Sequence, residues 1–319
     1  MKTMSETKQK VNDYVVVIGG MNMDIFGMPD NKVIDRDSNI GEIGLTVGGV
    51  GQNIAQNLAH LRVPTYLITV YGDDVHGTIM KAECEKNGIL LDYAEELKGQ
   101  RSSSYMYITD EIGDMLLGVN DMKICDKITP DFLANKLEFI NQASICLIDA
   151  NISEDSISWL ADHVTVPIFA DTVSVTKAPH LKAALGKIDT LKPNALEAGL
   201  LTGMQIRNIS DAKRAAIELL DTGLKNVYIS MGSEGILCAN AEEMIHVHTL
   251  PTDVINANGA GDCSMATITW CRYMQEFSIR RIGLATQAAA SIALESEKSV
   301  PDITPELISK KLEHLQITN

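Results

Sequence analysis

Short apolar runs alternate with helix-period segments along most of the chain. Residues 14–18 form an apolar run that ends at two glycines, and residues 65–70 repeat the pattern, so both predict buried strands. Between them, residues 52–61 space their apolar side chains along one face of a helix. The alternation continues with predicted strands at 145–148, 167–170 and 227–230 and predicted helices at 153–163, 181–185 and 210–221. Strands that alternate with helices predict an α/β fold with a mostly parallel sheet covered on both faces.

Two segments, residues 31–47 and residues 102–123, interrupt this alternation. The second predicts a hairpin in which residues 104–108 turn back into residues 115–119. A small sheet built from both segments would serve as a lid or as a dimer surface, and a decorated edge of the main sheet is the alternative. We therefore expect one domain over residues 1–319 that carries two lid segments.

The chain has 319 residues and a formal net charge of −15, which argues against a nucleic acid as its partner, since such binding depends on clustered Lys and Arg. A small nucleotide is compatible with this charge because it needs only a few local donors and a magnesium ion. The opening residues are polar, and no apolar run reaches the roughly 18 residues of a membrane span. The six cysteines lie far apart without a C-x-x-C pair, so we expect reduced thiols, a cytoplasmic location and no membrane partner.

The segment Asn-Ala-Asn-Gly-Ala-Gly-Asp at residues 256–262 carries the strongest chemical signal. Its small residues leave backbone N–H groups free where a helix is predicted to begin, and the partial positive charge of that helix end favours an anion. Gly259, Ala260 and Gly261 would hold a transferring phosphoryl group while Asp262 accepts the proton of the attacking hydroxyl. An ordinary loop-to-helix junction, with Asp262 as a first-turn cap, is the alternative.

Further polar clusters follow predicted strands or open predicted helices, which is where open α/β sheets bind ligands. Asn22 and Asp24 follow the first strand and suit paired sugar hydroxyls, with a turn cap as the alternative. The glycine-rich segment 48–53 lets the backbone and an Asn amide approach a polar ligand, although it matches neither common phosphate motif. Asn194 and Glu197 lie one helical turn apart, where they would face a magnesium-bound water unless Asn194 simply caps the helix.

Taken in this order, the clusters resemble the ribokinase-like carbohydrate kinases of the PfkB family. Two motifs carry the resemblance, the glycine pair at residues 48–53 and the closing glycine-rich motif at residues 256–262. The resemblance implies a three-layer α/β sandwich with a mostly parallel central sheet and a small β lid. It also implies ATP and Mg²⁺ as reactants, Asp262 as the catalytic base, and a homodimer formed through the lid.

The same resemblance assigns the remaining site residues. The sugar side comprises Asn22, Asp24, Gly48, Gly49 and Asn53. The nucleotide side comprises Asn194 and Glu197 at the phosphates, with Glu197 reaching the metal through water, then Ser230, Gly232 and Gly235 in a loop and Gln287 near the adenine. Residues Asn256 and Ala257 depart from the Asp-Thr of most members, in which the Asp helps to bind a monovalent cation. This departure predicts weak or no activation by potassium.

Within the family, several segments resemble the pseudouridine kinases. They are residues 46–58, 119–122, 149–154, 171–174 and 190–194. The resemblance implies phosphorylation of the 5′-hydroxyl of a C-linked uracil nucleoside, and Asn151 replaces a Glu of simple ribokinases, which suits a base at C1. An acceptor for the N1–H of that base would come from Ser102, Ser103 and Ser104 or from the pair Asn120 and Asp121.

Three other functions stay open from the sequence. One is a ribokinase or an inosine or adenosine kinase of the same family. Another is a non-catalytic sensor of a nucleotide or sugar, against which the intact Gly259, Ala260, Gly261 and Asp262 argue. The third is an acidic interaction protein, which would leave the polar clusters at the strand ends without a role.

Overall fold

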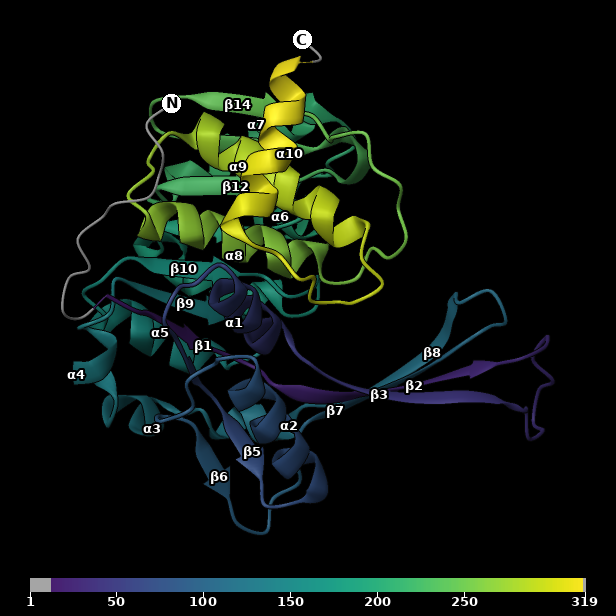
Figure 1. The fold of residues 1–319 in the computed structure, drawn as a ribbon. Coiled ribbons are helices and arrows are strands. Elements are labelled where there is room, and N and C mark those ends of the chain that lie inside the picture. Colours follow the sequence, from purple (N-terminus) through teal and green to yellow (C-terminus); the bar gives the residue numbers. More distant parts are fainter. Residues whose placement is uncertain (1–12, 318–319) are drawn as a thin grey trace.

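The computed structural model describes residues 13–317 and has an eight-stranded sheet at its centre (Figure 1). The strands lie in the order β14 (Met244–Val247), β13 (Ile236–Asn240), β12 (Asn226–Ser230), β11 (Thr190–Lys192), β10 (Ile168–Asp171), β9 (Ile145–Asp149), β1 (Val15–Ile18) and β4 (Thr65–Ile68). Neighbouring strands from β4 to β12 run parallel, whereas β13 and β14 add an antiparallel edge. The expected α/β fold with a mostly parallel sheet is confirmed.

Helices cover both faces of this sheet. One face carries α1 (Val50–His60), α2 (Val75–Lys86), α8 (Ala260–Tyr273), α9 (Ile279–Leu294) and α10 (Pro305–Ile317). The other carries α3 (Pro130–Ala134), α4 (Leu137–Ile140), α5 (Glu154–His163), α6 (Ala195–Thr202), α7 (Ile209–Asp221) and the 3₁₀ helices η1 (Lys123–Lys127) and η2 (Ala178–Lys187). A third 3₁₀ turn, η3 (Gly232–Glu234), connects β12 to β13.

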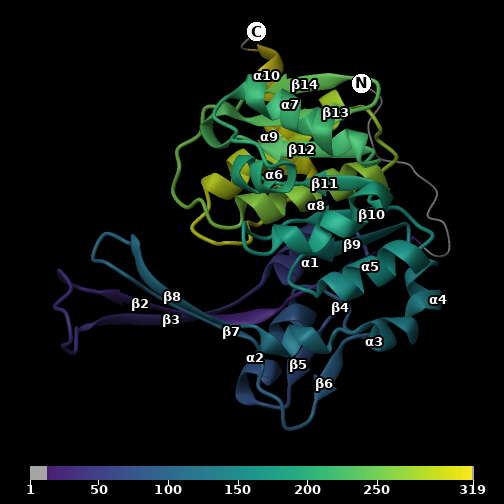
Figure 2. The ribbon, with the colours of Figure 1, turned by 180° about the vertical axis from the view of Figure 1, so that it is seen from behind.

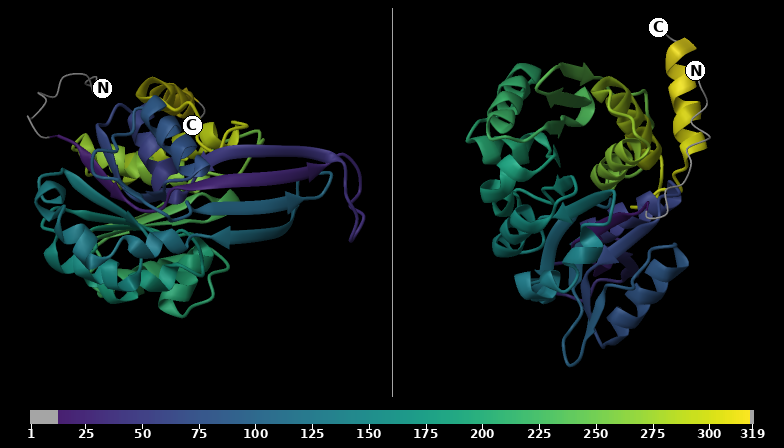
Figure 3. Two further views of the ribbon diagram at one scale, coloured as in Figure 1. Left: turned by 90° about the horizontal axis from the view of Figure 1, so that it is seen from below. Right: turned by 90° about the vertical axis from the view of Figure 1, so that its left-hand side faces the viewer.

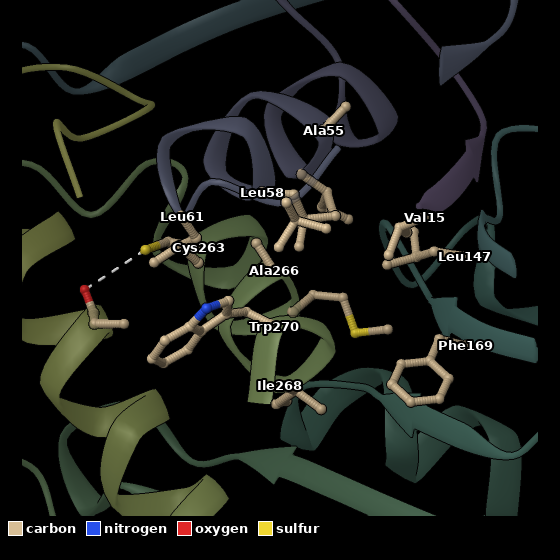
Figure 4. Close-up of a cluster of buried hydrophobic side chains, with 14 of the residues drawn as sticks. Val15, Ala55, Leu58, Leu61, Leu147, Phe169, Cys263, Ala266, Ile268 and Trp270 are labelled. Carbon is tan, nitrogen blue, oxygen red and sulfur yellow. Dashed lines mark hydrogen bonds between the residues drawn. The ribbon is translucent and has the colours of Figure 1, made fainter. Parts of the chain in front are cut away.

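The sheet is buried on both sides, which explains why its strands are continuously apolar. Successive side chains of a strand point to opposite faces, so Val15 and Val17 of β1 join one hydrophobic core while Val16 and Ile18 join the other. Figure 4 shows the first of these cores, in which Leu58 of α1 lies among side chains from α8 and the sheet. This packing holds the starts of α1 and α8 against the same edge of the sheet.

A second sheet projects from the main body as a long twisted arm (Figures 1 and 2, and the left view of Figure 3). Its four strands are β3 (Gly41–Gly48), β2 (Asn22–Pro29), β7 (Ser104–Thr109) and β8 (Met115–Asp121), in that order. The β7–β8 hairpin lies within the predicted segment 102–123. The strand β2 is not predicted by the sequence, because its residues lack a sustained alternation of apolar and polar side chains, although most of them are buried or half-buried.

Two element predictions differ from the structure in detail. The predicted strand 65–70 divides into β4 and β5 (Val70–Gly72), and β5 pairs with β6 (Glu95–Leu97) instead of with the main sheet. The predicted helix 181–185 belongs to the longer 3₁₀ helix η2, which has proline at its start. Both differences come from local backbone geometry that an apolar pattern does not encode.

All six cysteines are buried and unpaired. Burial raises the pKa of Cys146 to about 12, so this thiol stays protonated. Within residues 13–317, no helix combines the length and the apolar character needed to cross a membrane.

Candidate active site

A cavity of about 920 Å³ lies where the arm leaves the main body. It collects side chains that follow the C-terminal ends of β1, β9 and β10, which is the ligand-binding edge of a parallel sheet. Seven of the residues predicted from the sequence line it, namely Asn22, Asp24, Gly49, Asn53, Asn120, Asn151 and Gly259. The structure thus brings together residues that are as much as 237 positions apart in the chain (259 − 22).

The carboxylate of Asp149 connects three segments of the chain that border this cavity. It is fully buried at the end of β9 and accepts hydrogen bonds from the backbone N–H groups of Gly20 at 2.9 Å, Gly51 at 2.8 Å and Asn151 at 2.9 Å, and from the Asn151 amide at 3.1 Å. Burial raises the pKa of Asp149, and these four bonds oppose that shift. A Cβ at Gly19 would lie 2.5 Å from the carboxylate, so only glycine permits this approach.

Asn22 and Asp24 lie at the base of the arm and form one polar unit. The Asn22 amide donates a hydrogen bond of 2.5 Å to Asp24 Oδ1, because alternation along β2 places both side chains on one face. Burial raises the pKa of Asp24 to about 6, and the Asn22 hydrogen bond opposes the shift. A Cβ at Gly48 would overlap Asp24, so the glycine pair makes room for this carboxylate. Asp24 is therefore mostly ionised at pH 7 and can accept hydrogen bonds from hydroxyl groups.

The helix α8 begins without a side-chain cap. Gly259 occupies its N-cap position with φ +78°, and a Cβ there would overlap the carbonyl oxygen of Ser299. The first N–H groups of the helix, which include those of Ala260 and Gly261, have no helical partner and suit an anion. Glycine at residue 259 is thus required by its left-handed backbone conformation and by the close approach of the Ser299 backbone.

Asp262 lies in the first turn of α8 and is partly exposed. Its Oδ2 accepts a hydrogen bond of 2.8 Å from the amide of Asn53, which belongs to α1. Burial and the charge of Asp171 raise the pKa of Asp262 to about 7, while the Asn53 hydrogen bond and the charge of Lys192 oppose the shift. A carboxylate that titrates near neutral pH beside an anion-binding helix start is equipped to act as a general base.

Asn194 and Glu197 form a capping box at the start of α6. The Asn194 side chain accepts from the Glu197 N–H at 2.9 Å, and Glu197 Oε2 accepts from the Asn194 N–H at 2.8 Å. The Thr172 hydroxyl also donates to Glu197 Oε2 at 2.5 Å. Asn194 therefore caps α6, as the alternative interpretation of the sequence proposed. None of the described residues donates a hydrogen bond to the other carboxylate oxygen of Glu197, Oε1.

The other nucleotide-side residues lie outside the cavity wall described above. Ser230 ends β12, where its N–H donates to the carbonyl of Pro193 at 3.0 Å. Gly232 and Gly235 flank η3, and Gly235 has φ +98° with a Cβ position that would overlap the carbonyl of Val247. Gln287 is buried in the middle of α9.

Sequence reasoning assigned no role to Asp171 and Lys192, which the structure places together next to Asp262. The sequence does contain a signal for these two residues, because a charged residue ends each of two buried strands, a position that apolar packing does not explain. Tyr105 and Tyr107 also line the cavity, on alternate positions of β7. The sequence shows that the two tyrosines occupy alternate positions of a strand. It does not show which face of the arm borders the cavity.

Comparison with known proteins identifies the family of this chain. The pfkB family carbohydrate kinases match residues 12–306. The chain is 35% identical over 310 residues to a pseudouridine kinase of Escherichia coli strain K12, covering 96% of this chain and 99% of that one. A carbohydrate kinase from Agrobacterium tumefaciens superposes with a TM-score of 0.82 at 27% identity, over 94% of this chain and 97% of that one.

The Arabidopsis thaliana ribokinase, solved with ribose and ATP, superposes with a TM-score of 0.83 over 94% of this chain and 98% of that one, at 24% identity. This likeness supports the fold. The family match covers nearly the whole chain, and the E. coli relative is aligned over almost its full length. The chain therefore belongs to the pfkB family of carbohydrate kinases and is a phosphotransferase with a hydroxyl acceptor.

Proposed function

We propose that the protein transfers the γ-phosphoryl group of ATP to the 5′-hydroxyl of pseudouridine. The observation that carries this assignment is the hydrogen bond between Asn53 and Asp262, which connects the polar wall of the cavity to the base at the helix start. The similarity to the E. coli pseudouridine kinase supports the choice of acceptor. Ribose and the nucleosides inosine and adenosine are the alternative acceptors within the family.

The acceptor would bind with its sugar against the base of the arm. Asp24 and Asn22 are spaced to accept from and donate to neighbouring hydroxyls, and the Gly48 and Gly49 backbone allows close approach. Asp262 then accepts the proton of the attacking hydroxyl as the new O–P bond forms and the bond to the leaving ADP breaks. The Asn53 amide orients the Asp262 carboxylate for this step.

The phosphates would bind at the start of α8. The N–H groups of Ala260 and Gly261 and the positive end of the helix dipole stabilise the charge of the transferring group. The uncapped helix start fits an ATP phosphate, and Glu197 Oε1 with Asn194 would face Mg²⁺ through water. Bound Mg²⁺ supplies neutralisation of charge on the phosphates.

The adenine would lie toward the β12–β13 turn and α9. Ser230, Gly232 and Gly235 shape the turn, and Gln287 supplies an amide from the neighbouring helix. The packing of α9 against β13 and β14 brings these elements side by side. The arm would act as the lid, closing over the acceptor to exclude water that would otherwise compete as phosphoryl acceptor.

Asn120 is the best placed of the candidate base-recognition residues. Ser102 Oγ donates to Asp74 at 2.6 Å, and the Ser104 hydroxyl lies 3.1 Å from a ring nitrogen of His76. Asp121 pairs with Arg101 at 2.9 Å. Asn120 lines the cavity, and its amide oxygen can accept from the N1–H that distinguishes pseudouridine from uridine.

Asp262→Asn is expected to lower kcat by about 10²- to 10⁴-fold because the amide cannot accept the hydroxyl proton. For the wild type, kcat/KM is expected to rise with pH through an apparent pKa of about 7. ADP release from magnesium-ATP across pH 5.5 to 9.5 measures both quantities. Turnover of the variant close to that of the wild type would show that Asp262 is not the base. A wild type that binds ATP but turns over no acceptor would favour the alternative of a non-catalytic sensor.

The raised pKa of Asp262 also predicts how the Asp262→Asn substitution changes the stability of the fold. The folded-state pKa of about 7 lies above the unfolded value near 3.8, so the folded protein binds the extra proton and loses stability as pH rises through that interval. Asp262→Asn removes this loss, and its Tm at pH 8 should equal or exceed that of the wild type. A lower Tm would indicate that the loss of activity reflects a damaged fold.

Pseudouridine is expected to give the highest kcat/KM in a panel with uridine, inosine, adenosine and ribose. Asn120→Ala should lower the preference for pseudouridine over uridine by about tenfold, because the N1–H donor then lacks its acceptor. Asp121→Ala is the matched control, since this side chain is paired with Arg101. Preferred turnover of ribose or a purine nucleoside would replace the proposed acceptor.

Potassium is expected to change kcat by less than about twofold relative to tetramethylammonium, because a neutral amide offers no charge to a cation. The Asn256 Nδ2 donates to the carbonyl of Glu297 at 3.2 Å, and its Oδ1 accepts from the Asn258 N–H at 2.9 Å. Asn256→Asp restores a carboxylate at this position and should introduce potassium stimulation. Strong stimulation of the wild type would contradict the expectation.

A homodimer through the arm is expected, with a mass near twice the 34.7 kDa of one chain in light scattering. Apolar residues are exposed on the arm, including Ile43 at 80% and Leu117 at 61%, and both line a second hollow of about 560 Å³ near its far end. Ile43→Lys combined with Leu117→Lys should yield monomers, because two charges would lie in the contact. Ile217→Lys, on the exposed face of α7, is the control, and a monomeric wild type would exclude the dimer.

A further inference from the structure

A buried ion pair lies directly behind the start of α8. Asp171 and Lys192 are the last residues of β10 and β11 and face each other in the strand register. Lys192 Nζ lies 3.2 Å from Asp171 Oδ2, and only 6% of each side chain is exposed. A charge pair of this kind is costly to desolvate, so hydrophobic packing does not account for its presence at the edge of the sheet.

The ammonium of Lys192 is aimed at the helix that carries Asp262. A Cβ built on Gly261 would lie 3.5 Å from Lys192 Nζ, which places the charge beside the first turn of α8. The charged groups that act on Asp262 are Asp171 from β10, Asp149 from β9 and Lys192 from β11, and the Asn53 amide contacts it from α1. Among these groups, Lys192 supplies the positive charge.

We propose that Lys192 is a positioning residue whose ammonium offsets the negative charges of Asp149 and Asp171, so that Asp262 is ionised and ready to act as the base at neutral pH. This role depends on the kinase function proposed above. The catalytic step itself is unchanged, because Asp262 still accepts the proton and Lys192 acts through it. Burial lowers the pKa of Lys192, but the charges of Asp171, Glu197 and Asp262 raise it above its ordinary value, so the ammonium stays charged at neutral pH.

The signs of the neighbouring charges support this role. Burial, Asp171 and Asp149 all raise the pKa of Asp262, and Lys192 is the charged group that lowers it. Asp171 holds Lys192 through Oδ2 and accepts a 2.8 Å hydrogen bond from the Val173 N–H through Oδ1. Val173 lines the cavity with φ +63°, a strained conformation for a β-branched residue. The ion pair is therefore held in place from the cavity wall as well as from the sheet.

The test is the pH dependence of kcat/KM for Lys192→Met. Loss of the ammonium leaves two carboxylates unopposed, so the apparent pKa of the acidic limb should rise by about one unit. The loss of kcat/KM relative to the wild type should then be about tenfold greater at pH 6 than at pH 9.5. A purely structural role would lower the rate by the same factor across this range.

Three further variants separate charge from packing. Lys192→Arg keeps the charge and should return the acidic limb toward the wild-type position. Asp171→Asn removes a negative charge while keeping an oxygen for the Val173 N–H, and should shift the limb downward. Lys136→Met is the matched control because Lys136 is also a buried lysine, with its side chain 8% exposed and paired at 2.6 Å with Glu95, and neither residue lines the cavity.

The pH profiles of these variants distinguish the proposed role of Lys192 from a structural one. An upward shift for Lys192→Met, a downward shift for Asp171→Asn and an unshifted Lys136→Met would support the role of Lys192. A wild-type profile position in Lys192→Met, with any loss of rate independent of pH, would overturn it. A wild type that phosphorylates none of the acceptors would overturn the kinase function instead, so the two failures are distinguishable.

Discussion

The buried carboxylate of Asp149 is the interaction on which the rest of the site depends. It receives four hydrogen bonds from three segments that would otherwise end in unpaired N–H groups: the turn after β1, the first turn of α1 and the turn after β9. An uncompensated charge in this position would be costly, so the four hydrogen bonds favour the arrangement in which the three segments converge on the carboxylate. That arrangement sets the direction of α1, and with it the position of the Asn53 amide.

Three aspartates show how environment assigns different roles to one residue type. Asp149 has four donors and no exposure, and it serves the fold. Asp24 has one amide donor and faces the cavity, where its carboxylate is available to hydroxyl groups. Asp262 has one amide donor and neighbouring charges of both signs, and its pKa lies near neutrality. The number of donors and the sign of the nearest charges therefore separate a structural carboxylate from a reactive one.

Much of the main sheet could be predicted from the sequence because its strands are short, apolar on both faces and ended by glycine or a polar residue. The glycine-rich start of α8 could also be predicted from a local pattern, since a cluster of small residues marks an uncapped helix start. The strand β2 was harder to predict because it leaves the body and carries no consistent alternation. The pairing of Asp171 with Lys192 needs the spatial order of strands, which no local pattern contains.

The contact between Asn53 and Asp262 joins positions 209 residues apart. A growing chain emerges from the ribosome with Asn53 long before α8, the helix that carries the residue proposed as the base. Until α8 has been synthesised, the nascent protein therefore lacks the proposed base Asp262. Such long-range closure slows folding, since the ends of a large loop must meet before the contact forms. The same separation ensures that activity appears only when synthesis and assembly of the whole domain are complete.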